Sequence, residues 1–282
     1  MQPVTITAPA KINLYLHVTS RRSDGYHELD SLVTFCDLVD KITISPAADF
    51  SFSCMGPFSN SINRQDNLCI RAAKFFSERN GVNLCCDIHL EKNIPVAAGL
   101  GGGSADAAAV LRALENFYDV QVDADMTDMA HYLGADVPVC YGQSSAVMRG
   151  IGEICQNITL PDFWLVLVNP GKPCDTGAVF QGFSGEYAVI LEAREHIQSI
   201  SGLNQVLQDT TNQLQPSAET IVPDIKTIIE ELSRQKEVLV ARLSGSGATC
   251  FAVFEDRDAA LSAAEKMKQK FPAYWVSVNA NC

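Results

Sequence analysis

A glycine-rich segment near the middle of the chain has the composition of a phosphate-binding loop. It reads Pro-Val-Ala-Ala-Gly-Leu-Gly-Gly-Gly-Ser-Ala over residues 95–105, with four glycines between 99 and 103. Glycine has no Cβ atom, so backbone N–H groups can approach an anion closely. Apolar residues at helical spacing follow and predict a helix over 104–118, whose free N–H groups and positive dipole end face the same place. Loop and helix together predict a site for phosphate groups.

Two better-known nucleotide motifs do not fit this segment. A P-loop would need G-x-x-x-x-G-K-[ST], and a dinucleotide G-x-G-x-x-G that starts at Gly99 would need glycine where Ser104 stands. A flexible turn before an ordinary helix stays open as the alternative without a ligand. The alanine-rich start of the helix, which permits close backbone packing, argues against that alternative.

Three polar residues outside the loop are candidates for chemistry. Apolar residues at 12, 14, 16 and 18 predict a strand in which Lys11 and Asn13 share the opposite face. The strand alone favours a solvent-facing position for both, whereas phosphoryl transfer needs fixed cations and donors of this kind. Asp136 stands two residues before Pro138, and without context it predicts a helix N-cap.

These candidates must be positioned by a chain of 282 residues, a length that suits two domains. The first half is β-rich, and the second half alternates strands and helices in the manner of a ferredoxin-like α+β domain. We therefore expect domains at 1–158 and 159–282, with a polar, insertion-like segment of unassigned function at 186–220. Strands are predicted at 4–8, 11–19, 29–36, 40–45, 50–54, 85–91, 163–169, 238–243, 249–254 and 274–279, and helices from Asp66 to Asn80-Gly81 and at 104–118, 125–133, 221–236 and 257–270.

Composition limits the partners of the chain. Thirty-three acidic residues against 21 basic ones give a formal net charge of −12, which argues against nucleic acid and anionic membranes. The ten cysteines are scattered without a C-x-x-C pair, so reduced, mostly buried thiols are expected. No signal peptide or membrane-spanning stretch is visible in the sequence. These features predict a cytoplasmic protein.

Three motifs in order along the chain resemble those of the GHMP kinase superfamily. They are Ala-Pro-Ala-Lys-Ile-Asn-Leu at 8–14, the glycine-rich segment at 95–108, and Leu-Ser-Gly-Ser-Gly-Ala-Thr at 243–249. The resemblance implies an α+β fold with an N-terminal ribosomal-S5-like α/β domain and a C-terminal ferredoxin-like domain. It also implies ATP as phosphate donor with Mg²⁺, for which only Ser104 is a candidate ligand. The ATP-binding residues implied are Asn67, Pro95, Val96, Ala97, Ala98, Gly99, Leu100, Gly101, Gly102, Gly103, Ser104 and Ala105.

Within this superfamily, Gly-Ala-Asp-Val-Pro at 134–138 resembles the diphosphocytidyl-methylerythritol kinases. In that family the aspartate is the base, so the resemblance implies that Asp136 takes the proton from the substrate hydroxyl. Lys11 would hold the hydroxyl and the aspartate in place. A cation within about 4–6 Å also keeps a carboxylate ionised.

Two further segments resemble the part of these kinases that binds cytosine. Arg-Arg-Ser-Asp-Gly-Tyr-His at 21–27 matches a signature in which the tyrosine stacks on the base and the histidine hydrogen-bonds it. The segment 169–180 matches one whose phenylalanine covers the other face. A hairpin turn with an exposed aromatic and an ordinary core aromatic remain the alternatives. The substrate-binding residues implied are Asn13, Tyr26, His27, Asp136, Thr176, Phe180 and Gly245.

Some positions depart from the family pattern. Ala105 stands where a second serine is common, which removes one hydroxyl from the phosphate cradle. Residues 211–215 read Thr-Asn-Gln-Leu-Gln and lack two carboxylates of the usual segment, so no chemistry is assigned there. Asp66 is expected to cap the helix that starts near residue 67. For Gly245 and Gly247, a tight hairpin is the alternative to a loop beside the phosphates.

The resemblance thus implies ATP-dependent phosphorylation of the 2-hydroxyl of a cytidyl-methylerythritol acceptor in the non-mevalonate isoprenoid pathway. The alternatives are a mevalonate- or homoserine-type GHMP kinase and a non-catalytic nucleotide-binding protein of the same fold. The expected partner is a small molecule, with no nucleic acid and no membrane, and the chain is expected to be a monomer or weak homodimer.

Overall fold

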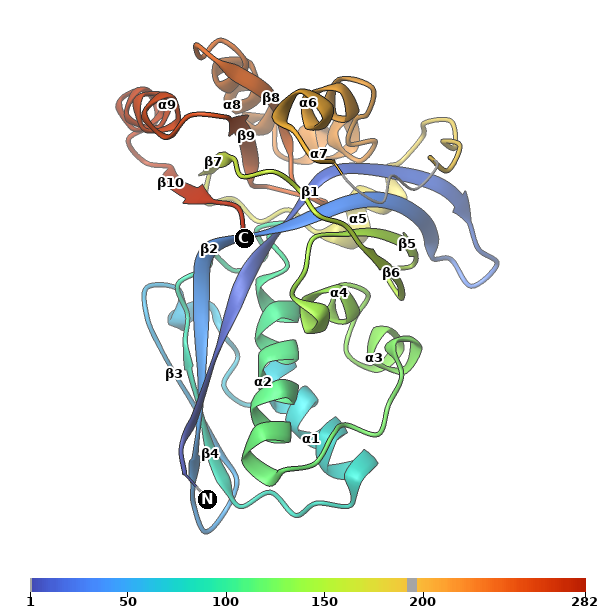
Figure 1. Cartoon of the computed structure of the whole chain (residues 1–282), viewed down its shortest axis with the longest axis vertical. Helices are drawn as coiled ribbons and strands as arrows, with labels where there is room; N and C mark the ends of the chain where they lie inside the picture. Colours follow the sequence, from blue (N-terminus) through green and yellow to red (C-terminus); the bar gives the residue numbers. More distant parts are fainter. Residues whose placement is uncertain (1, 192–196) are drawn as a thin grey trace.

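The chain folds around two β-sheets, each covered by helices. The computed structural model describes residues 2–191 and 197–282. The first sheet has the strand order β3-β4-β2-β5-β6, and β1 also pairs with β2. The second has the order β10-β7-β9-β8 and is antiparallel throughout. In Figure 1, β3, β4, α1 and α2 lie in the lower half, the β1–β2 hairpin rises from there past the middle, and the second sheet lies at the top with α6, α8 and α9. This mixed architecture confirms the predicted α+β class.

The first sheet is dominated by one long hairpin that crosses the molecule (Figure 1). Its two strands were predicted as shorter pieces, but register shifts between Pro9 and Lys11 and between Asn13 and Tyr15 let β1 continue. Helix α2 packs against both strands of the hairpin. The strands are β1 (Val4–Arg21), β2 (His27–Pro46), β3 (Ser51–Met55), β4 (Cys86–Glu91), β5 (Ala146–Gly150) and β6 (Ile154–Asn157), and the helices α1 (Leu68–Asn80), α2 (Gly102–Tyr118), α3 (Met126–Tyr132) and α4 (Val137–Gly142).

The second sheet closely follows the pattern expected from the sequence. Strand β7 carries a continuous apolar run, and it is almost entirely buried. The helix predicted at 221–236 is shorter, because Val222 and Pro223 separate α7 from α8. The elements are β7 (Trp164–Asn169), α5 (Thr176–Gln181), α6 (Ile200–Gln208), α7 (Gln215–Ile221), α8 (Asp224–Ser233), β8 (Val238–Leu243), β9 (Cys250–Phe254), α9 (Arg257–Lys270) and β10 (Trp275–Ala280).

Helix α1 begins with a different cap from the one expected. The side chain of Asn67, not Asp66, accepts a hydrogen bond from the backbone N–H of Ile70 at 3.1 Å. At its other end the helix stops at Gly81, which has the left-handed conformation (φ +62°) that the Asn80-Gly81 pair predicts. Asn67 is therefore committed to the backbone of its own helix.

Other expectations can be compared directly with the structure. All ten cysteines are free, and seven of them are buried, as expected for reduced thiols. None of the helices within 2–191 and 197–282 is long and apolar enough to cross a membrane. The predicted boundary at residue 158 falls between β6 and β7; the division into two domains stays a prediction.

Candidate active site

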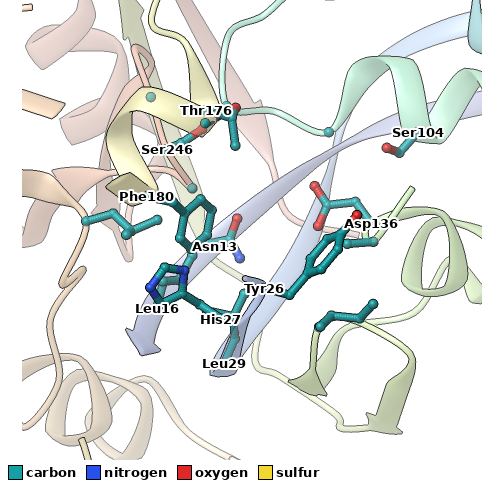
Figure 2. Close-up of a pocket in the computed structure, with 18 of the residues that line it drawn as sticks. Asn13, Leu16, Tyr26, His27, Leu29, Ser104, Asp136, Thr176, Phe180 and Ser246 are labelled. Atoms are coloured by element: carbon teal, nitrogen blue, oxygen red, sulfur yellow. Dashed lines mark hydrogen bonds between the residues drawn. The ribbon is translucent and has the colours of Figure 1, made fainter. Parts of the chain in front are cut away.

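A single cleft gathers most of the predicted site residues. It measures about 900 Å³ and is lined by β1, the β1–β2 turn, the glycine-rich loop, the turn before α4, α5 and the loop between β8 and β9. Figure 2 shows the side chains of Asp136, Tyr26 and Phe180 directed toward the same space. Residues more than 200 positions apart in the sequence therefore meet at one place.

Lys11 lines this cleft and is buried. Its ammonium donates a hydrogen bond to Oδ1 of Asn13 at 2.8 Å and forms an ion pair with Oδ2 of Asp136 at 2.9 Å. The shared face of Lys11 and Asn13 is therefore not a solvent face, because the glycine-rich loop covers it. The backbone N–H of Lys11 donates to the carbonyl of Leu100 at 2.9 Å, which attaches the strand to that loop.

Asp136 occupies the N-cap position of α4, but its side chain makes no capping hydrogen bond. The carboxylate instead pairs with Lys11, and its side chain keeps 31% of its surface exposed within the cleft. The helix-cap interpretation of this residue is therefore wrong for the side chain. A carboxylate that is fixed by a cation and still accessible has the geometry of a general base.

The glycine-rich loop takes a conformation that only glycines tolerate well. Gly99 and Gly101 have φ values of +73° and +61°, and α2 begins directly after them at Gly102. A Cβ atom on Gly101 would lie 3.1 Å from both Cβ and Cε of Lys11. The start of α2 therefore lies against the side chain of Lys11, and a helix N-terminus favours anions.

The second glycine loop, between β8 and β9, packs against the first. Ser244 donates from its hydroxyl to the carbonyl of Gly99 at 2.8 Å, and the N–H of Thr249 donates to the carbonyl of Ala98 at 3.0 Å. A Cβ atom on Gly99 would lie 2.4 Å from the carbonyl oxygen of Ser244. Gly245 reaches Asn13 from the same loop, since a Cβ there would lie 3.2 Å from Oδ1 of Asn13.

The other end of the cleft is aromatic. The rings of His27 and Phe180 stack with centroids 5.4 Å apart and an angle of 20° between their planes. Tyr26 is exposed at the mouth of the cleft. Burial, and then the positive charge of Arg21, lower the pKa of His27 below its ordinary value. A neutral imidazole both donates and accepts hydrogen bonds, which suits it to a heterocyclic base.

Not every predicted residue lines the cleft. The predicted ATP-binding residues outside the lining of the cleft are Pro95, Val96, Leu100, Ala105 and Asn67. Leu100 and Ala105 face the core, and Asn67 caps α1. The structure brings the remaining candidates together: Lys11, Asn13, Tyr26, His27, Ala97, Ala98, Gly99, Gly101, Gly102, Gly103, Ser104, Asp136, Thr176, Phe180 and Gly245.

Some lining residues had no role assigned from the sequence. Arg21 ends β1, Asp24 lies in the β1–β2 turn, and Ser246 comes from the second glycine loop. The hydroxyls of Ser246 and Thr176 lie 2.8 Å apart, which joins that loop to α5. All three residues belong to motifs that were recognised, so the motif positions were the available signal.

A buried charge cluster beneath the glycine-rich loop was not foreseen. Nζ of Lys92 lies 2.5 Å from Oδ2 of Asp40 and 2.6 Å from Oδ2 of Asp106, and all three side chains are almost fully buried. Burial raises the pKa of Asp106 well above its usual value, although Lys92 opposes this shift. Burial alone would lower the pKa of Lys92, but the carboxylates of Asp106 and Asp40 outweigh burial and raise it. A Cβ on Gly102 would lie 3.2 Å from Nζ of Lys92, so the cluster supports the start of α2.

The residues of the cleft agree with a metal that arrives with the nucleotide. Across the described residues, no group of three histidine, cysteine, aspartate or glutamate side chains is arranged to hold a metal ion. Mg²⁺ keeps much of its water and needs few protein ligands when phosphates bind it. Ser104, in the first turn of α2, lines the cleft and presents a hydroxyl there.

Comparisons with known proteins agree with this geometry. The N-terminal domain model of the GHMP kinases matches residues 67–144, and their C-terminal model matches residues 190–273. The 4-diphosphocytidyl-2-C-methyl-D-erythritol kinase of Paramagnetospirillum magneticum is 39% identical over 98% of both chains. The kinase of the same name from Agrobacterium fabrum is 42% identical over 95% of this chain and 93% of its own.

Solved structures give the same family. A crystal structure of 4-(cytidine 5'-diphospho)-2C-methyl-D-erythritol kinase matches with a TM-score of 0.78 and 32% identity, over 98% of this chain and 99% of the other. A homoserine kinase from Cytophaga hutchinsonii, with a TM-score of 0.70 and 14% identity over 100% of this chain and 95% of its own, shares the fold alone. The chain therefore belongs to the GHMP kinases, and within them to the 4-diphosphocytidyl-2-C-methyl-D-erythritol kinase family.

Proposed function

We propose that this chain transfers the γ-phosphate of ATP to the 2-hydroxyl of 4-diphosphocytidyl-2-C-methyl-D-erythritol. The relatives that match nearly the whole chain carry the name of this kinase. The observation that carries the proposal is the ion pair of Lys11 with Asp136. It lies in one cleft with a glycine-rich phosphate loop and with the stacked rings of His27 and Phe180. The acceptor hydroxyl, the phosphates and the cytosine would each meet a matching surface there.

In this proposal the carboxylate of Asp136 accepts the proton of the acceptor hydroxyl. The hydroxyl oxygen attacks the γ-phosphorus, a new P–O bond forms, and the bond to the β-phosphate oxygen breaks to release ADP. Lys11 fixes the carboxylate and lies beside the negative charge that develops on the transferred group. Asn13 holds Lys11 in turn, through its 2.8 Å hydrogen bond.

The phosphates of ATP would lie against backbone N–H groups of the glycine-rich loop and the N-terminus of α2. Gly99, Gly101 and Gly102 leave the space for that approach. Ser104 lines the cleft and would hold Mg²⁺ that arrives with the nucleotide, which would neutralise phosphate charge there. The cytosine would lie between Tyr26 and Phe180 and would hydrogen-bond to His27.

Three further attributes belong to the same proposal. We propose that the protein works in the cytoplasm, since its cysteines are unpaired. The acidic net charge of −12 supports a small-molecule role without nucleic acid. A monomer or weak homodimer is sufficient, because one chain supplies every group named above.

The direct test is acceptor-dependent ADP release with ATP and Mg²⁺. The cytidyl-methylerythritol acceptor is compared with mevalonate and homoserine, because a homoserine kinase and a mevalonate kinase share the fold. Release with the cytidyl acceptor alone is expected. Release with only mevalonate or homoserine would overturn the cytosine site and keep the kinase. ATP binding without turnover on any acceptor would indicate a non-catalytic protein.

A further inference from the structure

Among the described residues that line the cleft, one cation forms no ion pair. Four charged residues line it apart from His27, and two of them, Lys11 and Asp136, pair with each other. A third, Asp24, accepts two hydrogen bonds from the guanidinium of Arg22, at 2.9 and 3.0 Å. Arg21 is the fourth, and it makes no ion pair with any residue in 2–191 or 197–282. Its charge is free for a ligand.

Arg21 belongs to the aromatic end of the cleft. It is the last residue of β1 and is the direct cross-strand partner of His27, the first residue of β2. Cross-strand partners place their side chains on the same face of a hairpin. The positive charge of Arg21 is also felt at the ring of His27, whose pKa it helps to lower. A base held by His27 and Phe180 therefore has this guanidinium as a neighbour.

We propose that Arg21 binds the diphosphate of the cytidyl acceptor and makes the site selective for a nucleoside diphosphate over an uncharged nucleoside. The inference rests on the proposed function, in which the cytosine lies at His27 and Phe180. The diphosphate is bonded to the ribose of that cytidine, which brings it to the turn that holds Arg21. A guanidinium offers paired N–H donors that match phosphate oxygens.

Charge gives a second reason for a dedicated cation. The chain carries a formal charge of −12, and the proposed reaction brings two anionic substrates into one cleft. Lys11 is committed to Asp136, and the backbone donors of the glycine-rich loop are at the ATP end. Arg21 is the side chain that compensates the diphosphate at the other end.

The chain supplies its own control in the next residue. Arg22 carries the same charge on the same turn, but it pairs with Asp24 and does not line the cleft. We therefore compare Arg21→Gln with Arg22→Gln in the full chain. Arg21 is exposed at the end of a strand, so its replacement leaves the core unchanged. Two measurements are needed, one of turnover and one of binding.

In steady-state assays, Arg21→Gln is expected to raise KM for the cytidyl acceptor about tenfold, with kcat and KM for ATP within about twofold of the unsubstituted protein. Arg22→Gln should change the acceptor KM by less than about threefold. In calorimetric titrations without ATP, Arg21→Gln should weaken the affinity for CDP about tenfold and leave the affinity for cytidine unchanged.

Four outcomes would overturn the proposal. In Arg21→Gln, these are an unchanged affinity for CDP, an equal loss of affinity for CDP and cytidine, and a change confined to KM for ATP. The fourth is an effect of Arg22→Gln on acceptor KM or CDP affinity that equals that of Arg21→Gln. Failure of the proposed function is distinguishable, because it appears as no turnover of the acceptor by the unsubstituted protein. The titrations with CDP and cytidine still decide the role of Arg21 in that case.

Discussion

The ammonium of Lys11 lies 2.9 Å from Oδ2 of Asp136 and joins β1 to the turn that precedes α4. The two side chains differ in exposure, 4% for Lys11 and 31% for Asp136. The lysine therefore holds the carboxylate from the interior, while the carboxylate stays open to an incoming hydroxyl. In the proposed reaction this arrangement would separate positioning, by Lys11, from proton transfer, by Asp136.

Asp136→Asn is expected to lower kcat by about 10²- to 10⁴-fold, because the amide keeps the shape and cannot accept the proton. KM for ATP should change little, since the glycine-rich loop is untouched. Initial rates of ADP release measure both constants. The same change at the exposed Asp162 serves as control. Turnover of Asp136→Asn near that of the control would remove Asp136 from the role of base.

Gly99→Ala is expected to separate the two glycine loops. The new Cβ would lie 2.4 Å from the carbonyl oxygen of Ser244 and 2.8 Å from that of Gly247, in addition to the strain of φ +73°. We expect a loss of about 3 kcal/mol in the free energy of unfolding and a raised KM for ATP.

Gly171→Ala is the matched control for that change. Gly171 has a similar φ of +69°, but a Cβ there meets nothing within 4 Å. Gly171→Ala should lower the free energy of unfolding by about 1–2 kcal/mol and leave KM for ATP unchanged. Urea unfolding and ATP kinetics measure the pair. Equal effects of the two substitutions would show that strain alone, and not loop contact, explains Gly99.

Phe180→Ala is expected to raise KM for the cytidyl acceptor about five- to tenfold, because one face of the base loses its aromatic contact. Phe183→Ala is the control, since Phe183 also packs on His27, with ring centroids 6.1 Å apart, but does not line the cleft. KM for the cytidyl acceptor, measured for both variants, distinguishes contact with the base from support of His27. Equal increases in KM would point to support of His27 rather than contact with the base.

Local sequence was sufficient to locate the glycine-rich loop and the Lys11 strand. The glycines at 99 and 101 occupy the positive φ values that their residue type permits, and period two correctly placed Lys11 and Asn13 on one face. The strand alone predicts that both side chains face solvent, and this prediction is wrong. Leu100 and the second glycine loop, which come from remote parts of the chain, cover that face. Periodicity reports alternation, and it contains no information on what packs against each face.

Contacts between distant residues were the part that the sequence could not supply. Asp40, Lys92 and Asp106 carry no motif that joins them, and only the fold brings their charges together. The same is true of Asn212, which donates to the carbonyls of Leu243 and Gly245 from a segment given no chemistry. The capping residue of α1 was also predicted one position early, at Asp66 instead of Asn67. Both residue types can cap a helix, so the sequence does not distinguish them.

His17 is expected to make the stability of the fold depend on pH. The N–H of Thr211 donates to Nε2 of His17 at 3.3 Å, so that nitrogen carries no proton. Burial lowers the pKa of His17 below its ordinary value of 6.5; Asp30 opposes this shift and Arg242 adds to it. The unfolded chain therefore binds a proton at His17 more readily than the folded chain does. The free energy of unfolding should fall as the pH decreases below 6.5.

His17→Gln tests this dependence, because glutamine keeps an acceptor and does not titrate. The difference in unfolding free energy between His17→Gln and the unsubstituted protein should shift in favour of the variant as the pH falls from about 7.5 to about 5.5, one pH unit on either side of the ordinary histidine pKa of 6.5. Urea unfolding at several pH values measures it, with His131→Gln at the exposed end of α3 as control. Because Thr211 also hydrogen-bonds Leu16, a residue that lines the cleft, the same protonation should loosen the wall of the acceptor site. A pH dependence that is identical in His17→Gln and the unsubstituted protein would assign the acid sensitivity to other groups.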